Sequence, residues 1–537
     1  MSQPQAEASA PQAEGAPVAQ PDGAPVAAAA VRPLAGRWAG IAARYAPAGA
    51  AAVVMAVLGV WGLARDSAMG NDEVATRWAA LLSLHELAHL LNTVDAVHGL
   101  YYFFMHGWMA VGTSPAVMRI PSVIAMVAAV AMTAILARRL TGSGWAALFA
   151  GLVMALTPTI SYYAQTARSY AFVLACVLGS TLALLHALDA EIAGAPSRRI
   201  ARWWMAYGAL VTLGGYLNEM SLLVLAAHAV TVLLARYRPQ VLRHWAAAAV
   251  SATVLALPLL AISVREHAAI SWIPRPGLTA LRILFQDYFG ATMVVALLLL
   301  ACAIVAVLPA GRWWRVGGVS LPSVAAPLLV LPAGLLIGES LIAHPLYVDR
   351  YVLYGEAGAA LLAGAGMYRI GQWLSGAVRR RVLLWAPGVV VCVCALVLQI
   401  APQQRVRTPQ SRSYDFGTAS RYVGARARAG DGVLFFPNFY RKARLGYPAD
   451  FARISDFAMA TSPVQAGDFR GTDKPPQVTD QLMLGRQRIW VIGHVPSARL
   501  KTPAVRAESI WLQTHFTLIG QRRFRGMTVT LWQRDAP

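Results

Sequence analysis

Long apolar runs with few or no charged residues constrain the possible folds of this chain more than any other feature of its sequence. The first extends from Tyr45 to Ala64, and at about 1.5 Å per residue it just spans the hydrocarbon core of a bilayer. Further runs of similar length lie near residues 119–137, 145–162, 169–188, 203–217, 220–235, 245–264, 291–310, 321–338, 350–368 and 382–401. With 57% hydrophobic and 13% charged residues, the chain is predicted to be an α-helical polytopic membrane protein. We expect about eleven transmembrane helices.

The arginines between the runs predict an orientation. With the N-terminus inside, the cytoplasmic loops and the N-terminal tail carry 17 arginines, and the opposite loops carry eight. Because short loops rich in Lys and Arg stay in the cytoplasm, this asymmetry predicts a cytoplasmic N-terminus. An odd number of spans then puts everything after residue 402 outside. We therefore expect a multi-pass protein of the plasma (inner) membrane.

Three segments follow from the distribution of apolar residues. Residues 1–44, rich in Ala, Pro, Gln and Gly, are predicted to be a disordered cytoplasmic tail. Residues 45–402 carry the spans, and residues 403–537 are predicted to form an extracytoplasmic α/β domain. Its short apolar runs predict buried strands at 432–437, 488–493, 515–520 and 527–532, with helical or turn-rich stretches at 415–429 and 503–513.

The net charge of +21 would suggest a nucleic-acid partner in a soluble chain. Here 21 basic and nine acidic residues lie in 403–537, which is predicted to face away from cytoplasmic nucleic acid. We therefore expect no nucleic-acid partner, and attraction to anionic lipids or an anionic wall polymer instead. Lysine supplies only three of the 46 basic residues (Lys442, Lys474 and Lys501), which we attribute to a GC-rich coding preference.

The first outer loop, residues 65–118, is too polar to cross a membrane. Apolar residues at helical spacing from Thr76 to Leu91, and an aromatic-rich run from Leu100 to Val111, predict helices lying in the membrane interface. The adjacent acids Asp72 and Glu73 come just after the first span, close to the membrane surface. On composition alone, a solvated loop explains these two acids.

Short motifs at the outer ends of the runs carry a family resemblance. They are Asp72-Glu73, D-x-x-H-x-L-Y-Y (Asp95, His98, Leu100, Tyr101, Tyr102), R-x-P-S (Arg119, Pro121, Ser122), Y-Y-A-Q-T-A-R-S-Y at 162–170, W-I-P-R-P at 272–276 in the long outer loop 265–290, and H-P-L-Y-V-D-R-Y at 344–351. In this layout, over residues 45–400, the chain resembles the GT-C superfamily of membrane glycosyltransferases. Within it, the chain is most similar to the protein O-mannosyltransferases and the lipid A aminoarabinose transferases. Their segment usually has H-P-P-L-Y-Y, which the residues after His98 match in part.

The resemblance implies a GT-C fold and an activity. It implies transfer of a sugar, mannose or another pentose or hexose, from a polyprenyl-phosphate donor. The acceptor would be an extracytoplasmic glycan of the cell envelope, a lipid or a protein. By position in the motif, Asp72 matches the family's catalytic base and Glu73 a supporting acid, with Asp95 as the second choice for the base.

The chemistry of an inverting transfer suits these residue types. One carboxylate takes the proton of the acceptor hydroxyl, while the leaving phosphate needs cationic donors. Arg119, Arg168 and Arg350 each lie at the outer end of a run, where a guanidinium can bind a phosphate. Arginines that snorkel at a helix end give the same pattern. The remaining candidates are Tyr163 and Tyr170 for the donor phosphate, and His98, Tyr101, Tyr102, His344 and Asp349 for the substrate.

Two other classes of protein stay open. H-E-L-A-H at 85–89 matches the H-E-x-x-H pattern, in which two histidines on one helical face bind zinc and the glutamate is a general base, so an intramembrane zinc metalloprotease is an alternative. A basic chain with many spans also fits a transporter, although no internal repeat is evident. We assign no metal-ligating residue and leave a divalent metal ion open.

Overall fold

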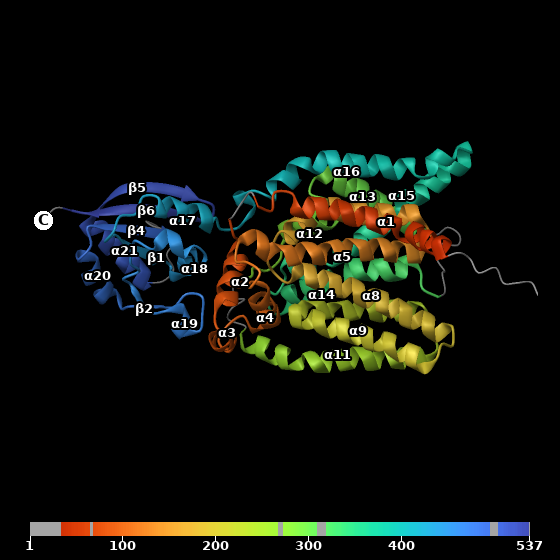
Figure 1. Ribbon diagram of the computed structural model, residues 1–537, viewed down its shortest axis with the longest axis horizontal. Helices are drawn as coiled ribbons and strands as arrows, with labels where there is room; N and C mark the ends of the chain where they lie inside the picture. Colours follow the sequence, from red (N-terminus) through yellow and green to blue (C-terminus); the bar gives the residue numbers. More distant parts are fainter. Residues whose placement is uncertain (1–33, 65–67, 267–271, 309–317, 494–502, 536–537) are drawn as a thin grey trace, which may run out of the picture. The chain divides into compact units, whose positions relative to one another are not determined.

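A computed structural model describes residues 34–64, 68–266, 272–308, 318–493 and 503–535 (Figure 1). Residues 45–537 form one compact unit, distinct from the residues before Tyr45. The predicted tail lies outside the described residues up to residue 33. Helix α1 (Leu34–Val60) already begins inside the tail, because its alanine-rich end has a high helix propensity.

Each predicted apolar run is mostly helical where the structure describes it. The helices that overlap the runs are α1, α5 (Pro115–Thr141), α6 (Gly144–Leu156), α7 (Pro158–Ala164), α8 (Tyr170–Ile192), α9 (Ser197–Leu217), α10 (Val224–Leu234), α11 (Pro239–Arg265), α13 (Met293–Val307), α14 (Leu321–Ile342), α15 (Gly355–Val378) and α16 (Ala386–Arg405). Helix α12 (Leu278–Phe289) lies in the predicted outer loop 265–290, where no run was predicted.

Fewer helices meet the length and hydropathy criteria for a membrane span than the eleven spans predicted from the apolar runs. In the described part of the chain, six helices are long and apolar enough to cross a membrane, namely α1, α5, α8, α11, α14 and α16. The pairs α6–α7 and α12–α13, bent by 67° and 68°, raise the number to as many as eight. Pro158 begins α7 at the first bend, since proline cannot continue the hydrogen bonding of the preceding helix. The predicted number of eleven thus stays a prediction.

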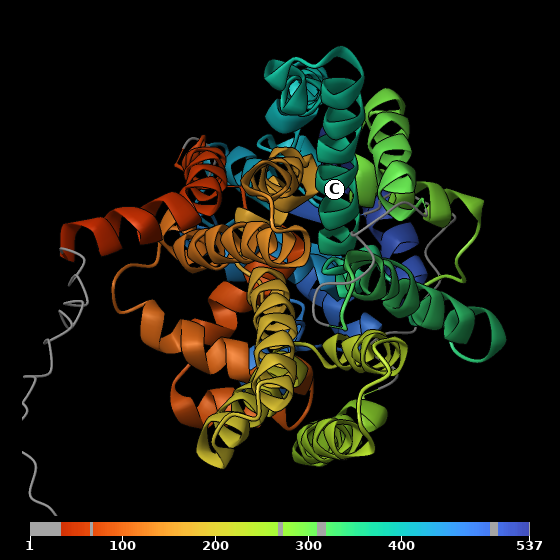
Figure 2. The same ribbon diagram turned by 90° about the vertical axis from the view of Figure 1, so that its right-hand side faces the viewer.

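Helix α15 packs closely against its neighbours through glycines. A Cβ atom on Gly364 would lie 2.3 Å from the backbone nitrogen of Ala150 in α6, and one on Gly366 would lie 1.8 Å from the carbonyl oxygen of Cys302 in α13. Small residues let helix backbones approach in this way inside a membrane. Figure 2 shows the helices from the end of the unit that lies opposite the β-sheet. The short helix η5 (Asp349–Val352), which carries Arg350, directly precedes α15.

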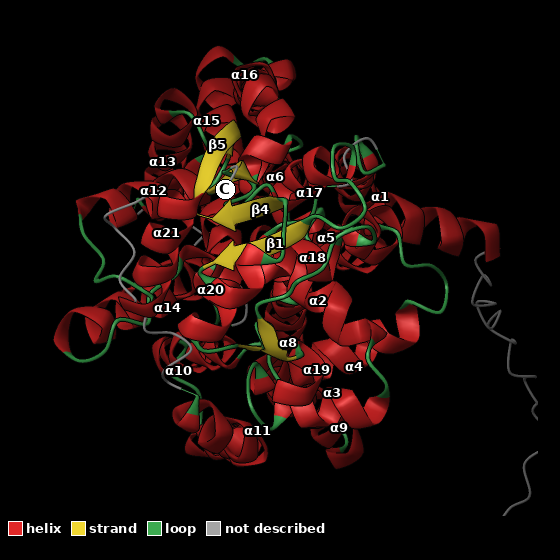
Figure 3. Ribbon diagram, turned by 90° about the vertical axis from the view of Figure 1, so that its left-hand side faces the viewer, coloured by secondary structure: helices red, strands yellow, loops and turns green. Residues whose placement is uncertain are grey.

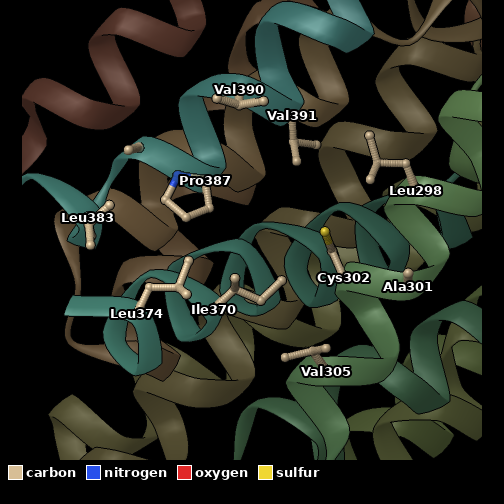
Figure 4. A pocket seen from close by; sticks show the side chains of 11 residues that line it. Leu298, Ala301, Cys302, Val305, Ile370, Leu374, Leu383, Pro387, Val390 and Val391 are labelled. Carbon is tan, nitrogen blue, oxygen red and sulfur yellow. The ribbon is translucent and has the colours of Figure 1, made fainter. Parts of the chain in front are cut away.

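An apolar pocket of about 480 Å³ lies between α13, α15 and α16 (Figure 4). Its lining residues are all apolar, among them Leu298, Ile370 and Val391. Ile370 lies 15 residues, or about 22 Å, along α15 from Gly355. The pocket therefore belongs to the part of the bundle away from Arg350.

The first outer loop forms four short helices: α2 (Asn71–Leu81), α3 (Leu84–Leu91), η1 (Ala96–His98) and α4 (Gly99–Trp108). The expected single helix from Thr76 to Leu91 is therefore wrong. The Ser83 hydroxyl accepts the backbone N–H of Glu86, and the Glu86 carboxylate accepts the backbone N–H of Ser83 at 2.9 Å. This capping box starts a new helix. The expected second helix is α4.

The four predicted strands of the C-terminal segment are confirmed as β1 (Gly432–Phe436), β4 (Arg488–Gly493), β5 (Phe516–Phe524) and β6 (Met527–Arg534). They form one sheet in the order β1-β4-β6-β5, with β1 parallel to β4 and the other pairs antiparallel (Figure 3). The predicted helical stretches correspond to α17 (Phe416–Gly424) and α21 (Pro503–His515). A two-stranded sheet of β2 (Met459–Thr461) and β3 (Thr472–Asp473), with α18 (Lys442–Gly446), α19 (Pro463–Ala466) and α20 (Pro476–Leu484), completes the segment. The α/β character is confirmed, and the boundary at residue 402 stays a prediction.

Candidate active site

The first turn of α2 presents two neighbouring acids to different surroundings. Carboxylates are favourable at a helix N-terminus, where the backbone N–H groups are unpaired. Successive residues of an α-helix point about 100° apart. Glu73 is accordingly turned inward and buried, with 1% of its surface exposed, whereas Asp72 is half-buried.

Glu73 is fully engaged by other parts of the chain. Its carboxylate accepts hydrogen bonds from Nε of Arg119 at 2.7 Å, from Nη2 of Arg119 at 2.9 Å, and from the backbone N–H of Ala167 at 3.0 Å. Arg412 lies 3.7 Å away. Burial raises the pKa of Glu73, but Arg119 and Arg412 outweigh burial and lower the pKa to about 2. Glu73 and Arg119 therefore pair with each other, and their predicted roles toward the acceptor and the phosphate stay predictions.

Asp72 is an ionised carboxylate without a direct ionic partner. It accepts one hydrogen bond, from Nδ2 of Asn71 at 3.2 Å, and makes no ion pair within 4 Å in the part of the chain that the structure describes. Burial raises the pKa of Asp72, but positive charge on Arg350, Arg168, Lys442 and His98 holds it well below its ordinary value. The carboxylate thus lies in the electrostatic field of several cations and pairs directly with none of them among the described residues.

Asp95 holds one of these cations in place. Its carboxylate accepts the hydroxyl proton of Tyr102 at 2.5 Å and lies 3.5 Å from Nη2 of Arg168. Nη1 of Arg168 donates to the Tyr102 oxygen at 2.6 Å. Burial raises the pKa of Asp95, but Arg168 and His98 lower it below its ordinary value. Asp95 is therefore less available as a base than Asp72.

Arg350 lies in an aromatic cage. Its guanidinium carbon lies 5.6–5.9 Å from the ring centres of Tyr170, Trp272 and Tyr351, and its Nε donates to the Tyr170 hydroxyl at 2.9 Å. Both terminal nitrogens lack a hydrogen-bond acceptor among the described residues. Tyr163 packs edge-on against Tyr170 at 5.3 Å. The cage therefore leaves the two terminal NH2 groups of the guanidinium for a bound anion.

The remaining predicted residues, His98, Tyr101, Asp349 and His344, differ in burial and in their hydrogen bonds. His98 and Tyr101 are buried, and within the described chain Nδ1 of His98 and the hydroxyl of Tyr101 have no hydrogen-bond partner. Asp349 accepts the backbone N–H of Arg350 at 2.8 Å. His344 is exposed, and the structure does not bring it to Asp72.

Two basic residues of the C-terminal segment reach this region and were not predicted from the sequence. Nζ of Lys442 donates to Oδ1 of Asn71 at 3.0 Å, and Lys442 is only 8% exposed. Arg412 donates to the Thr166 hydroxyl and to the Gln165 carbonyl, each at 2.9 Å. A signal for Lys442 existed, because a lysine is unusual in a chain whose basic residues are nearly all arginine.

The H-E-L-A-H motif lies within α3, outside the helices that are long enough to span a membrane. The Glu86 carboxylate caps the helix through Ser83, and both histidines are exposed. Nε2 of His89 lies 3.3 Å from the Gln465 carbonyl oxygen. Among the described residues, no three His, Cys, Asp or Glu side chains form a group that could hold a metal ion. This geometry gives the intramembrane protease no support.

Comparisons with known proteins agree with the fold. Residues 98–262 match the sequence model of the family described as dolichyl-phosphate-mannose-protein mannosyltransferase. The crystal structure of apo ArnT from Cupriavidus metallidurans has a TM-score of 0.54 at 14% identity, over 93% of this chain and 98% of that chain. At this identity the likeness shows that the two chains share a fold. The GT-C-type fold expected from the sequence motifs is thereby confirmed, and the long apolar helices agree with the expected multi-pass membrane protein.

Two further GT-C structures are similar. ArnT from C. metallidurans bound to undecaprenyl phosphate gives a TM-score of 0.54 at 13% identity, with the same coverage of both chains. The arabinofuranosyltransferase AftD from Mycobacteria gives 0.45 at 14% identity, over 91% of this chain and 40% of that chain. No curated protein matches the sequence.

Proposed function

We propose that this GT-C protein transfers a sugar from a polyprenyl-phosphate donor to an acceptor hydroxyl, with inversion at the anomeric carbon and with Asp72 as the general base. The observation that carries the proposal is the half-buried carboxylate of Asp72. It has no ionic partner within 4 Å among the described residues, yet it lies in the field of Arg350 and Arg168. This arrangement suits a reaction in which the carboxylate acts as a base and the cations stabilise an anionic leaving group.

In the proposed reaction the acceptor oxygen attacks the anomeric carbon. The bond from that carbon to the phosphate oxygen breaks, Asp72 takes the acceptor proton, and the polyprenyl phosphate leaves with its electron pair. The leaving group is already an anion, so it needs cations more than it needs an acid. Arg350 supplies two terminal nitrogens, and Nε of Arg168 has no partner among the described residues.

Donor binding would also raise the basicity of Asp72. The cations that lower its pKa are those assigned to the phosphate, so a bound phosphate offsets part of their charge. The carboxylate then competes better for the acceptor proton. We propose that this coupling makes Asp72 an effective base only when the donor is present.

Unpartnered buried polar atoms support a substrate pocket beside the acid. Buried polar groups in proteins are nearly always hydrogen-bonded, to protein, water or ligand. Nδ1 of His98 and the hydroxyl of Tyr101 have no partner among the described residues. We propose that these atoms, with Tyr163 and Tyr170, contact the sugar or the phosphate.

The similar ArnT structure contains undecaprenyl phosphate, which supports a lipid-linked donor. We further propose a cytoplasmic N-terminus, a reaction at the outer face of the plasma membrane, and an acceptor that is a cell-envelope glycan, a lipid or a protein. The sugar would be mannose or another pentose or hexose. In the same proposal, residues 403–537 form the extracytoplasmic α/β part of the compact unit, and their excess of basic residues attracts anionic lipids or an anionic wall polymer.

Mass spectrometry of lipids and envelope glycans tests the proposal. A deletion strain should accumulate a polyprenyl-phosphate sugar and lack that sugar on one envelope component. Wild-type protein and His85→Ala should restore both, because His85 is exposed on α3, whereas Asp72→Asn should restore neither. Unchanged lipid and glycan profiles in the deletion strain would refute the proposed function.

A further inference from the structure

Helix α18 of the C-terminal segment is fastened to α2 beside the proposed base. Nζ of Lys442, at the start of α18, donates to Oδ1 of Asn71 at 3.0 Å. At the other end of α18, Nη1 of Arg77 donates to the Gly446 carbonyl at 3.2 Å. The backbone N–H of Met69 donates to the hydroxyl of Tyr447 at 2.7 Å. These bonds join segments about 370 residues apart in the sequence, at the turn that contains Asp72.

The contact with Lys442 fixes which way the Asn71 amide points. A protonated lysine can only donate hydrogen bonds, so the amide must present its oxygen to Nζ. The amide nitrogen then points the other way, and Nδ2 of Asn71 donates to Oδ1 of Asp72 at 3.2 Å. The amide thus links a cation to the carboxylate, and the link works in one orientation only.

The surroundings of Lys442 hold its ammonium group in place. The side chain is 8% exposed, and Nζ lies 5.1 Å from the ring centre of Phe439 and 5.2 Å from that of Phe469. Two aromatic faces and one amide oxygen leave a long side chain little freedom. An ammonium group held in this way can fix the orientation of the Asn71 amide.

The charges around Lys442 make its protonation sensitive to pH. Burial lowers the pKa of Lys442 to about 8, while Asp95 and Asp72 act to raise it and Arg168 and Arg470 act to lower it. Loss of the proton lets Nζ accept as well as donate, so the amide orientation is no longer fixed.

We infer that Lys442 is a positioning residue, which orients the base Asp72 through Asn71, so that the C-terminal segment completes the active site of the membrane domain. The inference rests on the proposed role of Asp72. It gives the C-terminal segment a direct function in the reaction.

Steady-state kinetics of the purified full-length protein with a polyprenyl-phosphate sugar test the inference. Lys442→Met should lower kcat about 10- to 100-fold, the effect of losing a charge-assisted hydrogen bond, with little change in KM for the donor. Asn71→Asp, which keeps an acceptor for Lys442 but removes the donor to Asp72, should lower kcat similarly. The matched control is Lys474→Met, because Nζ of Lys474 donates to the Phe457 carbonyl within the same segment and should leave kcat unchanged.

The pH profile separates positioning from a purely structural role. Wild-type kcat should fall above pH 8 as Lys442 loses its proton. Lys442→Arg should keep most of the activity and move this limb to much higher pH, since arginine stays protonated. The inference would be overturned if Lys442→Met kept the wild-type kcat and the wild-type alkaline limb while Asp72→Asn was inactive. The proposed function would still stand in that case. Activity in Asp72→Asn would instead refute the proposed base.

Discussion

Glu73 and Arg119 form a buried ion pair, 2.7 Å from Nε to the carboxylate, that joins α2 to α5, while the adjacent Asp72 has no such partner in the described chain. The two neighbouring acids of α2 thus have different surroundings. Glu73 joins α2 to α5, and Asp72 keeps a carboxylate without an ionic partner among the described residues. The difference follows from helical geometry, which turns one side chain inward and the other toward Arg350 and Arg168.

We expect Glu73→Gln to destabilise the protein by about 3–5 kcal/mol, because removing one partner of a buried ion pair leaves the other charge unpaired. The matched control is Asp72→Asn at the next position, which should change stability little because Asp72 has no ion pair to lose. Thermal unfolding in the same detergent compares the two. Equal losses of stability would contradict the assigned structural role of Glu73.

Protonation of Glu73 should lower the stability of the folded protein at acid pH. The pKa of Glu73 is about 2 in the folded protein and about 4.5 ordinarily, so its contribution is fully present above pH 4.5 and is lost as the pH falls toward 2. The unfolding temperature of wild-type protein should fall over this interval. In Glu73→Gln the fall should be smaller, and an identical pH dependence of the two proteins would count against the pair.

Arg350→Gln should weaken binding of the donor, because its two terminal nitrogens are assigned to the phosphate. Loss of charge-assisted hydrogen bonds predicts a rise of about 10- to 100-fold in KM for the lipid-linked sugar. Arg379→Gln is the control, since Arg379 is exposed at the end of α15 away from Arg350. If both variants keep the wild-type KM, Arg350 does not bind the phosphate.

Alanine substitutions at two glycines of α15, Gly366 and Gly376, should have different effects on the stability of the protein. Gly366→Ala puts a Cβ within 1.8 Å of the Cys302 carbonyl oxygen and should destabilise the fold by about 1–3 kcal/mol or more. Gly376 has no atom within 4 Å of its Cβ position, so Gly376→Ala should be neutral or stabilise the helix by up to about 1 kcal/mol. The yield of monodisperse protein and its unfolding temperature measure the difference. Comparable behaviour of the two variants would contradict the close packing of α15.

The long apolar helices were predictable from the sequence, because they depend on a local pattern of apolar residues. The prediction of Asp72 as the base came from the family resemblance, since composition alone explains the two acids as a solvated loop. The break between α2 and α3 was also visible, since Ser83-x-x-Glu86 is a capping box. The same four residues overlap the H-E-L-A-H motif, which drew attention to zinc binding instead.

The partners of the charged residues could not be predicted in the same way. Glu73 and Arg119 each fitted a role in substrate binding, and only the folded chain brings the two side chains together. The contact of Lys442 with Asn71 joins residues 371 positions apart and depends on how α18 packs on α2. A single sequence contains no local pattern for such a contact.

Turnover of purified Asp72→Asn protein with a polyprenyl-phosphate sugar and its acceptor tests the central claim most directly. Asparagine keeps the shape of the side chain but cannot take a proton at neutral pH. We predict that sugar transfer falls by about 100-fold or more, the usual contribution of a general base, while the donor still binds and the protein stays folded. Transfer at the wild-type rate would contradict the assignment of Asp72 as the base.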